Sequence, residues 1–315
     1  MARYLVTGAA GFIGSHIAER LLRDGHEVRA LDNLATGKRE NIETVRAAGP
    51  ERFTWFEADI RDLEACRAAC DGVEFVLHEA ALGSVPRSVE HPGESTSVNV
   101  HGTVNVFQAA REKGVRRVVW ASSSSVYGDT PTLPKHEGMP LSPLSPYAAS
   151  KLAGEEYARV FARGMGLPTV SLRYFNVFGP RQDPNSQYAA VIPRFITALV
   201  RGERPTVYGD GGQSRDFTYV DNVVDANLAA CTRGEGAGEA MNIACGSRYT
   251  LLDLLATIGK QLGVTPNPEF LPPRAGDVRH SQASIDLAVR ALGFRPRIGF
   301  EEGLATTVEF FRRVA

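Results

Sequence analysis

A glycine-rich segment near the amino terminus constrains the fold of this chain more than any other feature. Residues 4–7 form a short apolar run typical of a strand, and a helical pattern later extends to about residue 23. Between them stand Gly8, Gly11 and Gly14 at three-residue spacing. Glycines in such a turn let a pyrophosphate approach the backbone, and the N–H groups at the helix start face its charge. The segment predicts a dinucleotide-binding βα unit, although similar turns also close βα units that bind nothing.

The next predicted strand ends in an acid. Residues 28–31 lead into Asp32 and Asn33, and Asp32 follows Gly8 by roughly 20 residues, the separation expected for an acid that binds the adenosine ribose. A carboxylate accepts hydrogen bonds from a free ribose 2′-hydroxyl and repels a 2′-phosphate, so Asp32 indicates NAD as the cofactor in preference to NADP. The alternative is that Asp32 only begins a turn at the strand end.

A second acid closes the following strand, which we expect over residues 53–58. Asp59 and Ile60 come directly after it. Since the carboxyl ends of parallel strands meet at one edge of a sheet, we expect this pair to meet the adenine edge of the cofactor. Asp59 could equally cap the helix that follows.

The larger pattern is an alternation of strands and helices. Strand-like apolar runs at 74–78, 117–121 and 168–173 alternate with helical stretches at 95–113 and 146–164. This order predicts an α/β fold with a Rossmann-type doubly wound parallel sheet.

The character of the chain changes after Asn176, where glycine and proline separate shorter elements. Helices near 220–232 and 251–262 follow. We interpret residues 1–176 as an NAD-binding Rossmann domain and residues 177–315 as mainly a smaller mixed α/β substrate domain. We also expect the chain to return to the first domain around 216–245.

Composition narrows the class of protein. The 315 residues carry a net charge of −1, with 35 basic and 36 acidic residues, so bulk electrostatics favours neither nucleic acid nor a membrane surface as a partner. No apolar run approaches the ~20 residues that span a bilayer, and no cleavable signal is recognisable after Met1. We predict a cytoplasmic protein.

The cysteines and histidines give no sign of a metal site. Cys66, Cys70, Cys231 and Cys245 are scattered, without ligand spacing to any histidine. Such usage is typical of free thiols in a reducing compartment. We expect no bound metal.

Tyr147 and Lys151 are the strongest candidates for chemistry. Four residues along a helix bring both side chains to one face, with β-carbons roughly 6 Å apart, and both lie downstream of the serine run 122–125. A neighbouring ammonium and a nicotinamide cation both favour phenolate, which makes tyrosine a usable proton acceptor. The spacing is also common on surface helices, and four serines can simply close a strand. With the glycine turn and Asp32, however, the pair predicts redox chemistry on a hydroxyl.

Taken together, these motifs resemble the extended short-chain dehydrogenase/reductase family, and within it the nucleotide-sugar 4-epimerases. The resemblance runs essentially end to end and rests on nine segments: 7–14, 32–33, 78–81, 99–103, 122–128, 147–151, 173–176, 214–217 and 276–277. It implies NAD-dependent inversion at C4 of a UDP-hexose through a transient 4-keto intermediate. The expected sugars are UDP-glucose and UDP-galactose, together with their N-acetylated counterparts.

The resemblance also assigns residues to roles. It implies that Tyr147 takes the proton of the sugar 4-hydroxyl, that Ser123 hydrogen-bonds the sugar O4, and that Lys151 holds the nicotinamide ribose. The implied cofactor-binding residues are Gly8, Gly11, Phe12, Ile13, Gly14, Asp32, Asn33, Asp59, Ile60, Ala80, Ala81, Asn99, Tyr147, Lys151 and Tyr174. The implied substrate-binding residues are Ser84, Ser123, Ser124, Ser125, Tyr147, Asn176, Ala190, Val191, Val207, Tyr208, Arg215, Arg274, Asp277 and Ser281.

One of these positions bears on the choice of sugar. Ser281 aligns with a residue that is a bulky tyrosine in epimerases restricted to UDP-glucose and a small residue in those that also accept the N-acetyl sugar. A serine leaves room for the acetamido arm, so we expect both sugars to be substrates. The serine could also be an ordinary loop residue.

Other reactions on the same scaffold fit less well. Related dehydratases and uronate decarboxylases carry an acid directly before a segment like Val126-Tyr127-Gly128, where this chain has Ser125. UDP-glucuronate 4-epimerases typically meet the carboxylate with a threonine and an arginine in the segment equivalent to 176–183. This chain has Asn176 and Asp183 there, and an acid would repel a carboxylate. UDP-glucuronate epimerisation is the second hypothesis.

A third hypothesis belongs to another class: a non-catalytic NAD-binding redox sensor or subunit. The intact set of Ser123, Tyr147 and Lys151 argues against it.

In similar proteins the helices equivalent to 95–113 and 146–164 pair two subunits, so a homodimer is expected. The apolar residues Val104, Phe107, Leu152 and Tyr157 allow this pairing, and they equally allow packing on the sheet.

Overall fold

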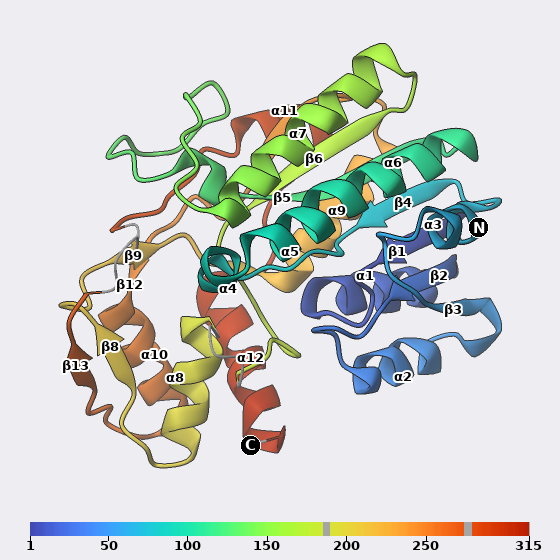
Figure 1. Cartoon of the computed structure of the whole chain (residues 1–315). Helices are drawn as coiled ribbons and strands as arrows, with labels where there is room; N and C mark the ends of the chain where they lie inside the picture. Colours follow the sequence, from blue (N-terminus) through green and yellow to red (C-terminus); the bar gives the residue numbers. More distant parts are fainter. Residues whose placement is uncertain (185–189, 274–278, 315) are drawn as a thin grey trace.

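A seven-stranded parallel sheet forms the centre of the larger unit in the computed structural model, which describes residues 1–184, 190–273 and 279–314 (Figure 1). The strand order is β11-β6-β5-β4-β1-β2-β3, and every neighbouring pair is parallel. The strands are β1 (Arg3–Thr7), β2 (Glu27–Asp32), β3 (Phe53–Glu57), β4 (Phe75–His78), β5 (Arg117–Ser123), β6 (Thr169–Tyr174) and β11 (Ala240–Ile243). The predicted doubly wound sheet is confirmed.

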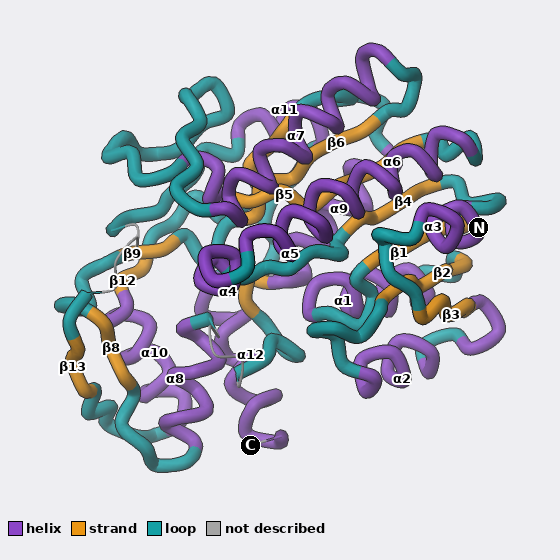
Figure 2. Tube along the Cα trace, in the orientation of Figure 1, coloured by secondary structure: helices purple, strands orange, loops and turns teal. Residues whose placement is uncertain are grey.

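Helices cover both faces of this sheet (Figures 1 and 2). One face packs on α1 (Phe12–Arg23), α2 (Arg39–Ala47), α9 (Val220–Thr232) and α11 (Asp286–Leu292). The other packs on α3 (Leu63–Cys70), α6 (Thr103–Glu112) and α7 (Pro146–Gly164). Because both faces are covered, the central strands are apolar along nearly their whole length, as in β1 and β5.

The helix that carries Tyr147 and Lys151 has the predicted bounds. Ser145 precedes α7, and its side chain accepts a hydrogen bond from the backbone N–H of Ala148 at 3.1 Å. Pro146 occupies the first helical position, where its missing N–H has no cost. These two residues fix the start of the helix just before Tyr147.

The helix predicted around 95–113 is present, but it starts three residues earlier and is not a continuous α-helix. The helical path begins with α5 (Pro92–Thr96), widens into a π-helical segment over Ser97–Gly102, and continues as α6. A β-carbon at Gly102 would lie 2.6 Å from the Ile60 side chain, so the wide turn lies tightly against the loop after β3. Such π segments are rare and often occur at functional sites.

Residues that follow Asn176 in the sequence complete the sheet. The edge strand β11 pairs with β6, in register from Ala240 with Ser171 to Ile243 with Tyr174. Helix α9 packs beside α1 on the same sheet face. The sequence after residue 176 therefore contributes to both parts of the molecule.

The smaller unit has its own core, at the lower left of Figure 1. Helices α8 (Val191–Val200), α10 (Leu251–Leu262) and α12 (Phe300–Val314) pack together there. Two-stranded pairs flank them: β7 (Val177–Phe178) with β10 (Thr218–Tyr219), β8 (Thr206–Tyr208) with β13 (Glu269–Leu271), and β9 (Ser214–Arg215) with β12 (Tyr249–Thr250). The remaining short helices are η1 (Pro50–Arg52), α4 (Val85–Glu90) and η3 (Ser124–Tyr127).

Candidate active site

A groove, which we call the sheet groove, lies over the carboxyl ends of β1 to β4. Eight of the residues predicted to bind the cofactor line it: Gly8, Gly11, Asp32, Asn33, Asp59, Ile60, Ala80 and Ala81. The sequence interpretation missed nine others: Leu31, Ala35, Thr36, Ala58, Arg61, Glu79, Leu82, Glu94 and Val98. Of the missed residues, Ala58 and Glu79 directly follow a strand, and four more lie within four residues of a strand end: Ala35, Thr36, Arg61 and Leu82. A position just after a strand end is the signal that could have identified these residues.

The glycines of the first turn are required by close backbone contacts. Gly8 has a φ of +68°, and a β-carbon there would lie 2.7 Å from the backbone N of Ala80. A β-carbon on Gly14 would lie 2.2 Å from the Gly8 carbonyl oxygen. Only glycine fits at these two positions, so the turn leaves space where a pyrophosphate can approach the start of α1.

Asp32 closes the wall of the sheet groove at the end of β2. Its carboxylate accepts hydrogen bonds from the backbone N–H of Ala10 at 3.0 Å and of Leu34 at 2.8 Å. Burial raises the pKa of this carboxyl, and the backbone donors oppose that shift. The side chain is thus fixed between the glycine turn and the loop after β2, in position to accept from ribose hydroxyls.

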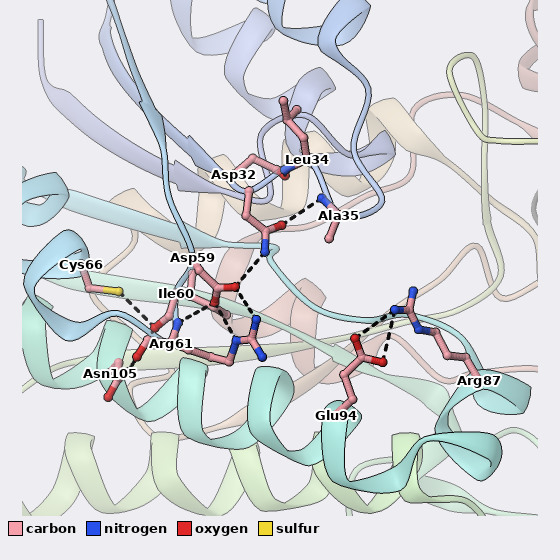
Figure 3. A network of polar contacts seen from close by, with 11 residues as sticks. Asp32, Leu34, Ala35, Asp59, Ile60, Arg61, Cys66, Arg87, Glu94 and Asn105 are labelled. Carbon is pink, nitrogen blue, oxygen red and sulfur yellow. Dashed lines mark hydrogen bonds and ion pairs between the residues drawn. The ribbon is translucent and has the colours of Figure 1, made fainter.

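Asp59 is already engaged by protein groups (Figure 3). Its carboxylate accepts from the Arg61 guanidinium at 2.7 and 3.0 Å and from the Asn33 amide at 2.9 Å. The Arg61 hydrogen bond lowers the pKa of Asp59 to about 2. The alternative role in helix capping is wrong, because Asp62 accepts from the backbone N–H groups that begin α3.

The other predicted cofactor residues lie around this groove. Phe12, Ile13 and Gly14 form the first turn of α1. Asn99, in the π-helical segment, is buried; its amide pairs with the backbone of Leu82 at 2.8 and 3.2 Å and donates to Ser150 at 3.1 Å. It therefore braces the groove wall against α7.

The three predicted catalytic residues come together at the end of β5. A hydrogen bond from Ser123 lowers the pKa of Tyr147, whereas burial, the larger effect, raises it. The Lys151 ammonium lies 5.9 Å from the centre of the Tyr147 ring and 5.0 Å from that of Trp120. Burial lowers the pKa of Lys151 to about 8. A proton donor, a phenol and a cation thus share one buried environment.

The four serines have different surroundings. Ser122 donates to the Glu155 carboxylate at 2.5 Å, on the opposite side of the strand from Ser123. Ser124 and Ser125 begin the turn η3, and the Ser125 backbone N–H donates to the Ser123 hydroxyl at 3.2 Å. Ser84 caps α4 by accepting from the Arg87 backbone at 3.2 Å. Of these five serines, Ser123 is the one that hydrogen-bonds the Tyr147 side chain.

A buried polar cluster holds this end of the sheet together. Arg173 on β6 forms an ion pair with Glu155 on α7 at 2.7 Å, and both side chains are almost fully buried. Arg173 also donates to the Tyr127 hydroxyl at 2.8 Å. Since Glu155 lies one helical turn beyond Lys151, the pair fixes α7 against the strands that present Ser123.

A second groove, the small-unit groove, is lined by residues of β7, α8, β8 and β9. It is lined by five predicted substrate residues: Asn176, Ala190, Val191, Tyr208 and Arg215. The sequence interpretation missed Val177, Phe178, Gln182, Ile192, Arg194, Thr206, Gln213, Phe217 and Leu251. The Arg194 guanidinium lies 5.9 Å from the centre of the Tyr208 ring, so a cation and an aromatic face meet in this groove.

The remaining predicted substrate residues differ in their placement. Ser281 lies beside Asn176, whose amide donates to the serine hydroxyl at 3.3 Å. The Val207 side chain, in contrast, is completely buried in the core of the smaller unit and does not line the groove. Its neighbour Tyr208 faces the groove because side chains alternate along a strand. Arg274 and Asp277 lie outside the described residues.

The apolar residues predicted for subunit pairing are only partly available. Phe107 is fully buried and packs edge-on against Phe161 inside the sheet core, so of the two alternatives this residue follows packing on the sheet. Tyr157 on α7 is 43% exposed, and Val160, one turn later, is 54% exposed. The outer face of α7 therefore retains exposed apolar side chains.

Three further observations concern the described part of the chain. Nowhere in residues 1–184, 190–273 and 279–314 do three His, Cys, Asp or Glu side chains gather as metal ligands. All four cysteines are free thiols. None of the described helices combines the length and the apolar character needed to cross a bilayer.

Comparison with known proteins places this geometry in a family. Residues 4–244 match the family model described as the NAD dependent epimerase/dehydratase family. The chain is 43% identical to the UDP-glucose 4-epimerase of Mycolicibacterium smegmatis, over 98% of both chains. It superimposes with a TM-score of 0.95 on a UDP-N-acetylglucosamine 4-epimerase of Methanobrevibacter ruminantium solved with UDP-N-acetylmuramic acid (39% identity, 100% of this chain and 99% of that one). For the Thermus thermophilus UDP-glucose 4-epimerase solved with NAD, the TM-score is 0.89 at 41% identity, over 99% of this chain and 100% of that one. The chain therefore belongs to the NAD dependent epimerase/dehydratase family.

Proposed function

We propose that this protein is an NAD-dependent UDP-sugar 4-epimerase, which inverts C4 of UDP-glucose and UDP-galactose and of their N-acetylated counterparts. The observation that carries the proposal is the position of Ser123, Tyr147 and Lys151. Strand β5, which presents Ser123, lies between β4 and β6. The residues after β4 line the sheet groove, and Asn176, just after β6, lines the small-unit groove. The catalytic group is thus placed where a dinucleotide and a second nucleotide would meet.

The residues of the sheet groove fit NAD. The crowded contacts of Gly8 and Gly14 would form a cradle for the pyrophosphate, and the Asp32 carboxylate would accept hydrogen bonds from the adenosine ribose. Lys151 would hold the nicotinamide ribose. When bound, NAD supplies the hydride acceptor for C4 of the sugar and returns the hydride in the second half of the reaction.

Side chains of the protein would transfer the proton of the sugar 4-hydroxyl. Tyr147, as phenolate, takes the proton of the 4-hydroxyl, and Ser123, which hydrogen-bonds Tyr147, would also contact that hydroxyl oxygen. Lys151 favours the phenolate because its ammonium lies against the tyrosine ring. Tyr147 then returns the proton after the 4-keto sugar has turned in the pocket.

The small-unit groove would hold the nucleotide of the substrate. Arg215 suits the diphosphate, because a guanidinium donates to two oxygens at once. Tyr208 and Arg194 offer a ring and a cation for the base. Binding through the nucleotide leaves the hexose free to rotate, which the reaction requires.

The test is to purify the protein, measure nicotinamide absorbance and nucleotide content, and then add UDP-glucose. Interconversion with UDP-galactose supports the proposal. Bound NAD without turnover of any UDP-sugar would instead identify the redox sensor or subunit, and absence of NAD binding would exclude both.

UDP-glucuronate epimerisation remains the second candidate because of one structural observation. Asp183, whose charge argued against a carboxylate substrate, forms an ion pair with Lys38 at 3.2 Å. A paired acid repels a carboxylate less than a free one. The assay with UDP-sugars should therefore include UDP-glucuronate. Turnover of UDP-glucuronate in preference to UDP-glucose would make UDP-glucuronate epimerisation the first candidate function.

We further propose a homodimer that pairs through the outer face of α7, and a cytoplasmic location in keeping with the four free thiols. The division into an NAD-binding domain over 1–176, joined again by residues 216–245, and a substrate domain over the remainder is supported by the return of α9 and β11 to the sheet.

A further inference from the structure

One carboxyl group of the sheet groove has no role in the proposed reaction. Glu79 follows β4 and lines the groove beside Ala80. Its Oε1 accepts a hydrogen bond from the Tyr174 hydroxyl at 2.8 Å, and the Asn227 amide donates to that same hydroxyl at 2.8 Å. Because Asn227 also donates to the Val223 carbonyl, its N–H groups are fixed and the single phenol proton is directed to Glu79. The carboxyl is held in one position.

The strand order shows which half of a dinucleotide lies near Glu79. Asp32, the acid for the adenosine ribose, ends β2, and the glycine turn follows β1. Strand β4 lies on the opposite side of β1 from β2. A dinucleotide with its adenosine at Asp32 and its pyrophosphate at the glycine turn therefore extends its nicotinamide half over β4. Glu79 lies at this end of the sheet groove.

Glu79 also shares its electrostatic environment with the catalytic pair. Burial raises the pKa of Glu79 to about 7, and the hydrogen bond from Tyr174 and then the Lys151 cation oppose the shift. The Glu79 charge in turn raises the pKa of Lys151 and of Tyr147. Further titratable groups beside Glu79 are its chain neighbour His78, whose pKa burial and the Lys151 cation lower, Tyr174 and, behind Tyr174 on α9, Cys231. At pH 8.5 the groove therefore holds a carboxylate within electrostatic range of Lys151.

We propose that the Glu79 carboxylate makes the enzyme prefer oxidised over reduced nicotinamide cofactor, an inference that rests on the proposed function. The oxidised nicotinamide ring carries a positive charge and the reduced ring is neutral. The Lys151 ammonium disfavours the charged ring, and an anion at Glu79 offsets this repulsion. Since an epimerase begins each cycle with oxidised cofactor, Glu79 keeps the resting enzyme in its competent form.

The test measures cofactor affinity rather than activity. Glu79→Gln removes the charge and keeps an oxygen that accepts from Tyr174. Calorimetry on the cofactor-free protein at pH 8.5 should show the affinity for NAD relative to NADH falling about tenfold, which equals about 30 mV in the potential of the bound two-electron couple. Glu79→Leu, a second neutral variant, should shift the ratio in the same direction.

The matched control is Glu74→Gln, which removes a carboxylate that precedes β4, pairs with Arg116 and does not line the sheet groove. Its NAD-to-NADH ratio should stay within about twofold of the wild type. A shift in Glu74→Gln as large as in Glu79→Gln would show that loss of a carboxylate outside the groove has the same effect, and would overturn the inference. An unchanged ratio in both neutral variants would also overturn it, with the proposed function left intact. A wild-type protein that binds neither nucleotide would overturn the proposed function itself.

Discussion

The Lys151 ammonium donates a hydrogen bond to the backbone carbonyl of Ala121, 2.7 Å away. This contact ties α7 to β5 two residues before Ser123, and thereby fixes Lys151 and Ser123, the predicted catalytic residues, relative to each other. It also holds a cation in a buried position, and burial lowers the pKa of Lys151 to about 8.

A buried lysine of this kind should lower stability at neutral pH. The fall in the pKa of Lys151 from 10.5 to about 8 corresponds to a penalty of roughly 3 kcal/mol in the free energy of folding. A Lys151→Met variant avoids this penalty but loses the hydrogen bond to Ala121, which contributes about 1 kcal/mol. The native state binds the lysine proton less tightly than the unfolded chain. Wild-type stability therefore rises as pH increases from about 8 to 10.5, and the full penalty applies below pH 8.

We accordingly expect cofactor-free Lys151→Met to be inactive but more stable than the wild type at pH 7, by about 1–2 kcal/mol, with the gain gone near pH 10.5. Urea denaturation at both pH values measures this. A variant that is less stable at pH 7 would show that the contacts of the ammonium outweigh its desolvation.

Tyr147→Phe should remove turnover and leave NAD bound, because the ring stays and only the proton acceptor is lost. The expected fall in kcat is about 10²–10⁴-fold. Tyr157→Phe, on the same helix but 43% exposed, is the matched control and should retain activity. The kcat of Ser123→Ala should lie between those of Tyr147→Phe and Tyr157→Phe, since Ser124 or water can replace part of the Ser123 contact. Wild-type rates in Tyr147→Phe would exclude the proposed mechanism.

Asp32 should discriminate between NAD and NADP. In the wild type a 2′-phosphate would face the Asp32 carboxylate, so NADP should bind more weakly by at least tenfold in calorimetry. Asp32→Asn keeps a hydrogen-bonding oxygen and should reduce the difference between the affinities for NAD and NADP. Asp59→Asn is the control, since that acid is already paired with Arg61. Equal binding of both cofactors by the wild type would show that Asp32 serves only the turn.

The size of the side chain at position 281 should determine whether the acetamido group of an N-acetylated substrate fits the site. The Ser281 hydroxyl lies beside Asn176 at the small-unit groove. Ser281→Tyr should reduce kcat/KM for UDP-N-acetylglucosamine by tenfold or more and change the value for UDP-glucose little, because exclusion is steric. The plain sugar serves as the internal control. Undiminished turnover of UDP-N-acetylglucosamine in the variant would show that residue 281 does not control acceptance of the N-acetyl sugar.

The outer face of α7 should hold two subunits together. Val160→Lys places a charge on that exposed apolar face and should convert a dimer to a monomer, measured by light scattering after size-exclusion chromatography. Val264→Lys is the matched control, at 43% exposure in the smaller unit, and should leave the dimer intact. A monomeric wild type would contradict the homodimer.

The sequence by itself determined the features that depend on near neighbours in the chain. The Gly8 to Gly14 turn, the acid at the end of the second strand and the bounds of the Tyr147 helix all follow from local geometry. A glycine turn, a cap and a four-residue helical spacing are set within a few residues, so they can be predicted without knowing the rest of the fold.

Only the tertiary structure decided which side chains meet. It brought Ser123, and not Ser122, to Tyr147, and it turned Val207 into the core while Tyr208 faces the groove. It also joined Asp59 to Asn33, which directly follows the neighbouring strand β2, and placed Glu79 in the sheet groove. These outcomes depend on strand register and on partners far away in the chain. A one-residue change in register reverses which face a side chain occupies, and no local pattern fixes that choice.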